Sequence, residues 1–204
     1  MDIGPTPSRV IPAYEYRRER WRNGAGWTRE IHVEPGTTGS DWHWRLSIAE
    51  IEQDAAFSTF PGVDRELVLL SGNGLQLDMD GRPSTTLSPP HGRCRFAGEE
   101  AVTGRLLDGP THDFNLMWRR DAFSAQLWHR PLVGPMVIFV DPGSTWAVHL
   151  LAGAAGFAAD SALRPLAMGD TALLRAHGLR TRHALEGGGE ALLIRLDPVA
   201  ARPL

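Results

Sequence analysis

Arginine is the residue type that offers this chain the most chemistry. All 21 of its Lys+Arg residues are arginine, so no lysine amine is available for a Schiff base or a phosphate-binding loop. Arg29, Arg45, Arg65 and Arg119 fall within strand-like segments rather than loops. A guanidinium is planar, permanently charged and able to bind a carboxylate through two parallel hydrogen bonds. We expect Arg45 and Arg65 to line an anion pocket, with outward-facing pairing to surface acids as the alternative for any one arginine.

Three polar side chains are expected near these arginines. Asn23 and Asn115 supply amide groups, and His43 lies two positions before Arg45 on the polar face of the same segment. Together they would offer hydrogen bonds to the uncharged part of a small anion. The sequence therefore predicts a pocket of mixed guanidinium and amide chemistry.

Other kinds of catalytic or metal site find little support. The eight histidines include no HxH, HxxxH or HExxH, and the closest pairs stand six or more residues apart. We therefore expect no metal and no cofactor, although ligands could still converge from distant strands. No GxSxG elbow is present, and the spacing of Ser58, His43 and Asp64 does not indicate a triad. Glu30, Glu50 and Glu66 are interpreted as partners for surface arginines.

Composition sets the expected partners and compartment. The formal charge of -3 provides no general attraction to nucleic acid or anionic membrane. Residues 14–26 interleave arginines with Tyr14, Tyr16 and Trp21, a pattern that can bind single strands, but we interpret them as an exposed edge strand or first turn. The single Cys94 has no partner for an internal disulfide. No long apolar run is present, so we expect a soluble cytoplasmic protein.

The elements that must position these residues are strands. Residues 42–48 alternate apolar and polar side chains, residues 66–70 form an apolar run, and Phe60-Pro61-Gly62 between them predicts a tight turn. From about residue 123 a similar but weaker pattern of strand-like segments recurs, at residues 136–140, 146–151 and 191–196. With 22 Gly and 15 Pro, this pattern predicts an all-β chain of two tandem barrels, at residues 1–125 and 126–204.

Four ordered blocks carry a resemblance to a known family. Residues 21–31 (WRNGAGWTREI), 41–51 (DWHWRLSIAEI), 57–74 (FSTFPGVDRELVLLSGNG) and 113–120 (DFNLMWRR) resemble the HutD/Ves family of bacterial bicupin proteins. The resemblance is specific over residues 21–120 and faint over 126–204. It implies the cupin fold, an RmlC-like jelly roll, in both halves.

The resemblance also allows the metal-binding positions of cupins to be compared. Counting along the cupin motif places Arg65 where the acidic ligand would stand, and Ser58 and Phe60 at two histidine positions. Ala101 stands for the third histidine. All four ligands are thus replaced, and a fixed positive charge is gained at Arg65. We therefore add Ser58 and Phe60 to the expected ligand-binding residues.

The resemblance implies a small-molecule role in histidine utilisation. HutD-like proteins are thought to bind an intermediate of histidine breakdown, with N-formylglutamate or urocanate as candidates, and to restrain expression of the pathway. The alternative is a metal-independent hydrolase or isomerase acting on a small carboxylate, with His43 or Glu50 transferring the proton. A third hypothesis, an interaction module, rests on edge strands and on Trp128 and Trp146. Among partners, a homodimer is a further expectation.

Overall fold

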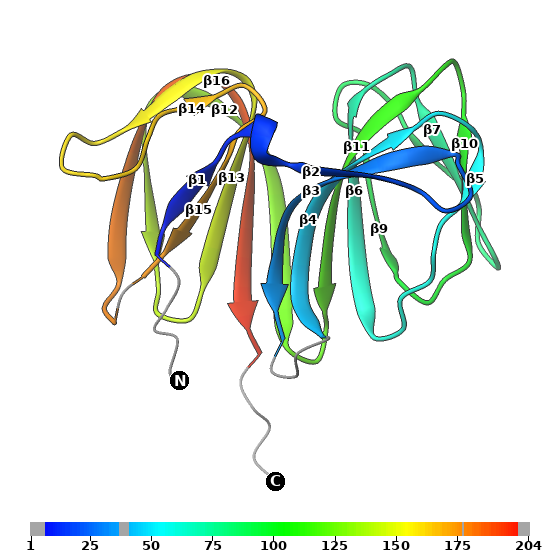
Figure 1. Cartoon of the computed structure of the whole chain (residues 1–204), viewed down its shortest axis with the longest axis horizontal. Helices are drawn as coiled ribbons and strands as arrows, with labels where there is room; N and C mark the ends of the chain where they lie inside the picture. The colour runs from blue at the N-terminus through cyan, green and yellow to red at the C-terminus, as the bar shows by residue number, and fades with distance from the viewer. Residues whose placement is uncertain (1–6, 37–40, 177, 200–204) are drawn as a thin grey trace, which may run out of the picture. The chain divides into compact units, whose positions relative to one another are not determined.

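The computed structural model describes residues 7–36, 41–176 and 178–199. The chain divides into two compact units, one of residues Tyr16–Phe123 and one that combines the residues up to Glu15 with those from Ser124 onward (Figure 1). The N-terminal strand β1 (Arg9–Ile11) pairs with β15 (Thr171–Arg175), so the second unit draws on both ends of the chain. The expected assignment of residues 1–125 and 126–204 to two domains stays a prediction.

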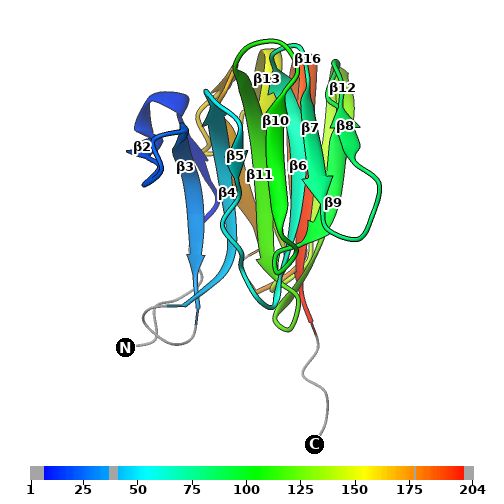
Figure 2. The same ribbon diagram turned by 90° about the vertical axis from the view of Figure 1, so that its right-hand side faces the viewer.

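The unit of residues 16–123 is a sandwich of two antiparallel sheets, whose layers Figure 2 shows one behind the other. The six-stranded sheet has the order β2 (Arg17–Arg20), β3 (Gly26–Pro35), β4 (Trp42–Ile51), β11 (Thr111–Arg119), β6 (Val63–Ser71) and β9 (Arg93–Ala97). The four-stranded sheet has the order β5 (Ala55–Ala56), β10 (Val102–Leu106), β7 (Leu75–Met79) and β8 (Thr85–Leu87).

The core of this unit is formed by side chains of both sheets. Leu67 and Leu69 of the six-stranded sheet pack with Leu75 and Leu77 of the four-stranded one, and all four are essentially inaccessible to solvent. The face of the larger sheet that carries Leu67 and Leu69 also carries the polar side chains of β4, because alternate residues of a strand point to opposite sides. The predicted alternation of residues 42–48 is therefore confirmed, as is the turn at residues 60–62.

The other unit is built on a single six-stranded antiparallel sheet. Its order is β1, β15, β13 (Thr145–Phe157), β16 (Thr181–Pro198) and β12 (Phe123–Val140), and β14 (Leu166–Ala167) pairs with β13. A short 3₁₀ helix, η1 (Ala13–Glu15), follows β1. The rings of Trp128 and Trp146 stack with their centroids 5.8 Å apart, and both pack against the core of this unit. Both tryptophans therefore contribute to the interior of this unit, and the interaction module stays a hypothesis.

The predicted fold class is confirmed, with corrections to individual elements. The sheets form jelly-roll-like layers rather than closed barrels. Residues 136–140, expected to form a strand of their own, are only the end of the 18-residue β12. Pro131 and Pro135 suggest a break in that segment, yet β12 lies at the edge of its sheet, where a missing N–H costs no ladder hydrogen bond. Within the described residues, no helix is long and apolar enough to span a membrane.

Candidate functional site

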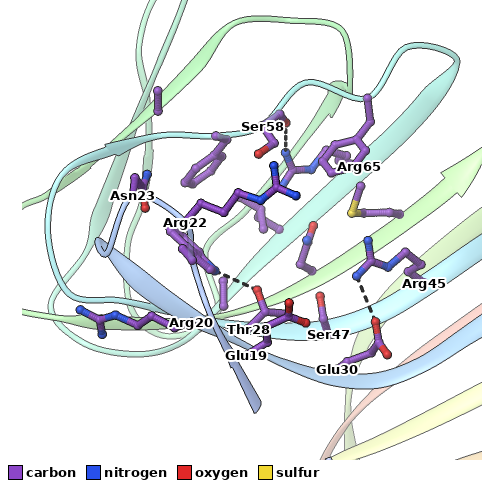
Figure 3. A pocket seen from close by; sticks show the side chains of 18 of the residues that line it. Glu19, Arg20, Arg22, Asn23, Thr28, Glu30, Arg45, Ser47, Ser58 and Arg65 are labelled. Carbon is purple, nitrogen blue, oxygen red and sulfur yellow. Dashed lines mark hydrogen bonds and ion pairs between the residues drawn. The ribbon is translucent and has the colours of Figure 1, made fainter. Parts of the chain in front are cut away.

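A cavity of about 590 Å³ opens in the unit of residues 16–123 (Figure 3). Its wall combines residues of β2, β3, β4, β6 and β11 with the segment that follows β5. Six of the seven predicted site residues line it: Asn23, Arg45, Ser58, Phe60, Arg65 and Asn115. The volume falls within the roughly 300–1,000 Å³ typical of sites for small molecules.

Sheet register brings the central residues together. Met117 of β11 lies directly opposite Arg45 of β4 on one side and Arg65 of β6 on the other. Two residues along β11, Asn115 lies between Ser47 and Leu67. Because side chains two residues apart share a face, both rows point into the cavity. The two arginines are therefore neighbours across one intervening strand.

The segment carrying Ser58 and Phe60 is tied to the sheet by backbone hydrogen bonds. The Phe60 amide donates to the Gly98 carbonyl at 2.7 Å, and the Gly98 amide donates to the Val63 carbonyl at 2.6 Å. A Cβ at residue 98 would lie 2.5 Å from the Phe60 carbonyl oxygen, so only glycine allows this approach. The Arg65 Nη1 in turn donates to the Ser58 carbonyl at 3.3 Å. The cavity wall is therefore braced from β6 and from the loop after β9.

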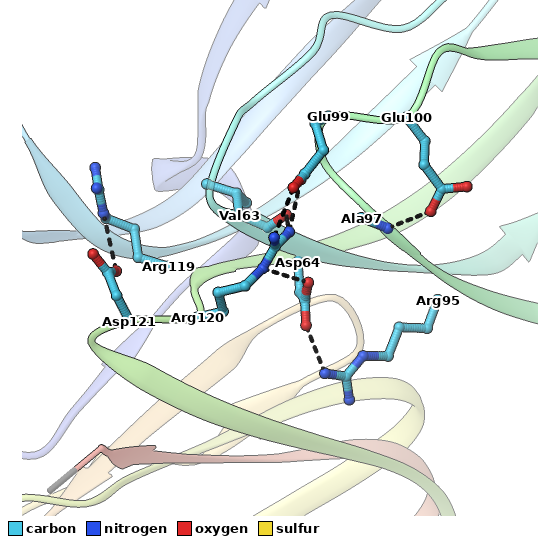
Figure 4. A network of polar contacts seen from close by, with 9 residues as sticks. All are labelled: Val63, Asp64, Arg95, Ala97, Glu99, Glu100, Arg119, Arg120 and Asp121. Atoms are coloured by element: carbon cyan, nitrogen blue, oxygen red, sulfur yellow. Dashed lines mark hydrogen bonds and ion pairs between the residues drawn. The ribbon is translucent and has the colours of Figure 1, made fainter. Parts of the chain in front are cut away.

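A polar network lies at the ends of these same strands (Figure 4). Arg120 donates from Nη1 and Nη2 to the two carboxylate oxygens of Glu99, each at 2.7 Å, and from Nε to Asp64 at 3.0 Å. Its Nη2 also reaches the Val63 carbonyl at 2.8 Å. The Arg120 guanidinium lowers the pKa of Glu99 to about 2, so the Glu99–Arg120 ion pair beside the start of β6 stays charged at neutral pH.

Arg65 is a buried cation among aromatic rings. Only 7% of its surface is exposed. Its guanidinium carbon lies 5.4 Å from the ring centroid of Phe57, 5.7 Å from that of Phe60 and 5.1 Å from that of Phe96, distances that allow cation–π attraction. Burial and, to a lesser extent, the charge of Arg45 lower the pKa of Arg65 to about 10, so it remains protonated at neutral pH. No carboxylate of the described residues forms an ion pair with it.

Arg45 differs from Arg65 in having an acid beside it. Its Nη2 lies 3.1 Å from Glu30 Oε2, and its guanidinium carbon lies 5.6 Å from the Trp42 ring centroid. The other two strand arginines follow the alternative of surface pairing: Arg29 Nε lies 2.7 Å from Glu50, and Arg119 Nε lies 3.4 Å from Asp121. The four arginines therefore separate into two in the cavity and two outside it.

His43 lies outside the cavity, which corrects its predicted grouping with Arg45. Its ring meets the Phe123 ring edge-on, with centroids 5.3 Å apart, and it is absent from the cavity wall. Glu50 is also absent from the wall, because its carboxylate is held by Arg18 at 2.6 Å and by Arg29. Neither proton-transfer candidate of the enzymatic alternative therefore faces the cavity.

Several residues of the cavity wall were not predicted from the sequence. Glu30 and Phe57 belong to it, and so does Arg22, which had been interpreted as part of a solvated segment. Alternation along β3 puts Glu30 on the same side as Thr28, a signal that could have identified it. Arg22 lies in a turn, where no periodicity predicts the direction of a side chain. The described wall residues include no histidine or cysteine, and the expected absence of a metal stays a prediction.

Comparison with known proteins identifies relatives of this chain. The HutD family model matches residues 13–193. A 21.2 kDa protein encoded in the hutC 3' region of Pseudomonas putida is 41% identical over 118 residues, which are 58% of this chain and 62% of that protein. Protein Ves of Citrobacter koseri is 44% identical over 108 residues, 52% of this chain and 56% of its own length. The matched segment thus spans about three fifths of these curated relatives.

Solved structures extend the similarity to the whole chain. HutD from Pseudomonas fluorescens SBW25 superimposes with a TM-score of 0.82 at 29% identity, covering 95% of this chain and 100% of that one. A bacterial pirin from Escherichia coli, at 7% identity, has a TM-score of 0.67 over 94% of this chain and 99% of its own, and supports the cupin fold alone. The chain therefore belongs to the HutD family, which is linked to the histidine-utilisation locus.

Proposed function

We propose that this protein is a receptor for a small carboxylate and regulates histidine utilisation by binding an intermediate of the pathway, such as N-formylglutamate or urocanate. The observation that carries the proposal is Arg65, a guanidinium that is 93% buried, faces a cavity and has no acid beside it among the described residues.

A buried charge without a counter-ion is costly to the protein. Removing a cation from water is unfavourable by several kcal/mol unless an anion and hydrogen bonds replace the lost hydration. The three phenylalanines and the Ser58 carbonyl replace only part of it. The Nε atom of Arg65 is buried and has no partner. A bound carboxylate would supply the missing charge and accept from the free N–H groups.

Electrostatics of the whole wall favour an anion as the ligand. Arg45 contributes a second guanidinium across the one intervening strand, β11, and its charge lowers the pKa of Arg65 because like charges repel. An incoming carboxylate would relieve that repulsion. The amides of Asn23 and Asn115 and the hydroxyls of Ser47 and Ser58 would suit the uncharged part of such a ligand.

Isothermal titration with N-formylglutamate and with urocanate tests the proposal. Methionine in Arg65→Met fills the space of the aliphatic part of the arginine, so the variant should fold. It should melt at no lower temperature than the wild type, because a buried charge is removed. It should lose about 2–5 kcal/mol of binding free energy for the ligand that the wild type binds. Arg119→Met, which removes an arginine outside the cavity, is the matched control and should bind as the wild type does. Equal affinities in wild type and Arg65→Met would remove Arg65 from the site.

The enzymatic alternative is separated by following the same compounds with NMR. Only an enzyme would change the spectrum of a carboxylate in excess over protein. With His43 and Glu50 directed away from the cavity, we expect the spectra to stay constant. Turnover at substoichiometric protein would replace the receptor by a hydrolase or isomerase.

A further inference from the structure

The three sheets of the described residues end in six edge strands: β1, β2, β5, β8, β9 and β12. An edge strand exposes unpaired backbone N–H and C=O groups, and proteins protect such edges by short length or by charged side chains. β1, β5 and β8 are only two or three residues long. β2 carries three exposed arginines, and β9 carries two. Of the described edges, β12 alone is long, with 18 residues, and free of charge over residues 131–140.

The second half of this uncharged stretch, residues 135–140, is called the β12 edge segment below. It begins after Gly134, whose φ of 76° interrupts the regular strand geometry. Alternate side chains of the segment pack in the core of their unit: Met136, Ile138 and Val140. The side chains between them are exposed to solvent: Pro135, Val137 and Phe139. A solvated strand face normally carries polar residues, so an apolar one indicates a surface that becomes covered.

The backbone of the β12 edge segment can pair with a further strand. A proline is tolerated in an edge strand where its nitrogen points away from the neighbouring strand. Alternate residues of an antiparallel strand direct their backbone groups to the same side, so Val137 and Phe139 share the direction of Pro135. The N–H groups of Val137 and Phe139 therefore face the open edge of the sheet, where no described strand accepts them.

Charged groups lie at the end of the β12 edge segment rather than along it. The Arg180 guanidinium carbon lies 4.9 Å from the Phe139 ring centroid, and its Nε lies 3.5 Å from Asp141 Oδ1. The charge of Arg180 is therefore matched within its own chain, and the segment offers no net charge that would select an acidic or basic peptide. An apolar centre with a polar border is the usual composition of a protein interface.

We propose that the β12 edge segment pairs with the same segment of a second copy of this chain, antiparallel about a twofold axis at Val137. This pairing puts Val137 opposite Val137 of the partner subunit, and Phe139 opposite the partner's Pro135. The Phe139 N–H then donates to the carbonyl of that proline, which needs no N–H of its own. Association stops at two copies, because the other end of this sheet is the short β1. The inference is independent of the proposed function, since the cavity lies in the unit of residues 16–123.

Charged substitutions of Val137 test the pairing, because this side chain is 43% exposed and the fold should tolerate a charge there. Sedimentation analysis of the wild type should give the mass of two chains. Val137→Lys and Val137→Glu, each alone, should raise the dimer dissociation constant about tenfold or more, because like charges meet at the axis. An equimolar mixture of the two variants should associate again, since opposite charges then meet. Met168→Lys, at a side chain that is 67% exposed in the turn before β15, is the control and should dimerise as the wild type does.

A wild type with the mass of one chain at high micromolar concentration would overturn the inference. A dimer that persists unchanged in both charged variants would do the same, because it would form through another surface. If each variant is monomeric and the mixture does not associate, the twofold axis at Val137 is excluded. Amide hydrogen exchange of the wild type gives a second measurement that needs no variant. The Val137 and Phe139 amides should exchange more slowly at concentrations above the dissociation constant than below it, and equal rates would count against strand pairing.

Discussion

Replacing Asp113 by asparagine should stabilise the protein above neutral pH and have little effect in acid. Asp113 lies on β11, is completely buried, and has the apolar residues Ala49 and Leu69 opposite it on the flanking strands. Its Oδ2 accepts a hydrogen bond from the Thr111 hydroxyl at 2.7 Å, and its Oδ1 has no partner. Burial raises the pKa of the Asp113 carboxyl to about 7, with the Thr111 bond opposing that shift.

The magnitude follows from the size of the shift. In the unfolded chain the carboxyl titrates near its ordinary value of about 3.9. Between that pH and about 7 the folded state holds a proton that the unfolded state has released, so stability falls as the pH rises. About three pKa units at about 1.4 kcal/mol each amount to roughly 4 kcal/mol. That stabilising contribution is complete below about pH 4 and is lost once the pH exceeds 7.

Asparagine keeps an oxygen to accept the Thr111 hydroxyl but cannot ionise. Urea unfolding of the wild type and Asp113→Asn should therefore give similar free energies near pH 4.5, and the variant should be more stable by about 2–4 kcal/mol at pH 8. Asp121→Asn, whose side chain is 68% exposed, controls for loss of a carboxylate as such. A difference between wild type and Asp113→Asn that does not change with pH would refute the assignment of a buried, protonated Asp113.

Two further predictions concern the cavity wall. Gly98→Ala should shift the Phe60 segment, because the new Cβ would meet a backbone oxygen at 2.5 Å, and should cost about 1–3 kcal/mol of stability in urea unfolding. Gly156→Ala, which has no atom within 4 Å of its Cβ, is the control, and equal costs would show that the close approach is unimportant. Glu30→Gln should tighten N-formylglutamate binding by about threefold or more in calorimetry, because Arg45 loses its internal carboxylate. Unchanged or weaker binding would exclude competition between Glu30 and the ligand.

The strands nearest the site were the easiest to predict. Residues 42–48 alternate cleanly because one face is packed and the other meets the cavity, and β4 contains them. The long strands of the other unit were truncated in prediction because proline and glycine usually interrupt strands. In β16, Gly189 has a φ of 131° and a Cβ there would lie 1.9 Å from the Ala152 oxygen, so glycine marks a close strand approach rather than a break.

The chemistry of Arg45 and Arg65 could be predicted because strand positions carry information about direction. Arg45 lies on the polar face of residues 42–48, opposite in phase to Trp44 and Leu46, and in the fold this polar face lines the cavity. His43 shows the limit of that argument. It shares the phase of Arg45 but lies two residues along β4, where its neighbour is Phe123 and the cavity has ended.

The sequence by itself determined the all-β architecture and the alternation of β4, because these depend on residue type and local periodicity. The position of Arg65 at the place of a cupin metal ligand is implied by the resemblance to the family and stays a prediction. Only the tertiary structure decided which arginines find an acid. Ion pairing depends on residues that are distant in sequence, as Arg45 with Glu30 and Arg29 with Glu50 show. Whether a guanidinium is neutralised or left for a ligand is therefore a property of strand register and turn geometry, which no single segment encodes.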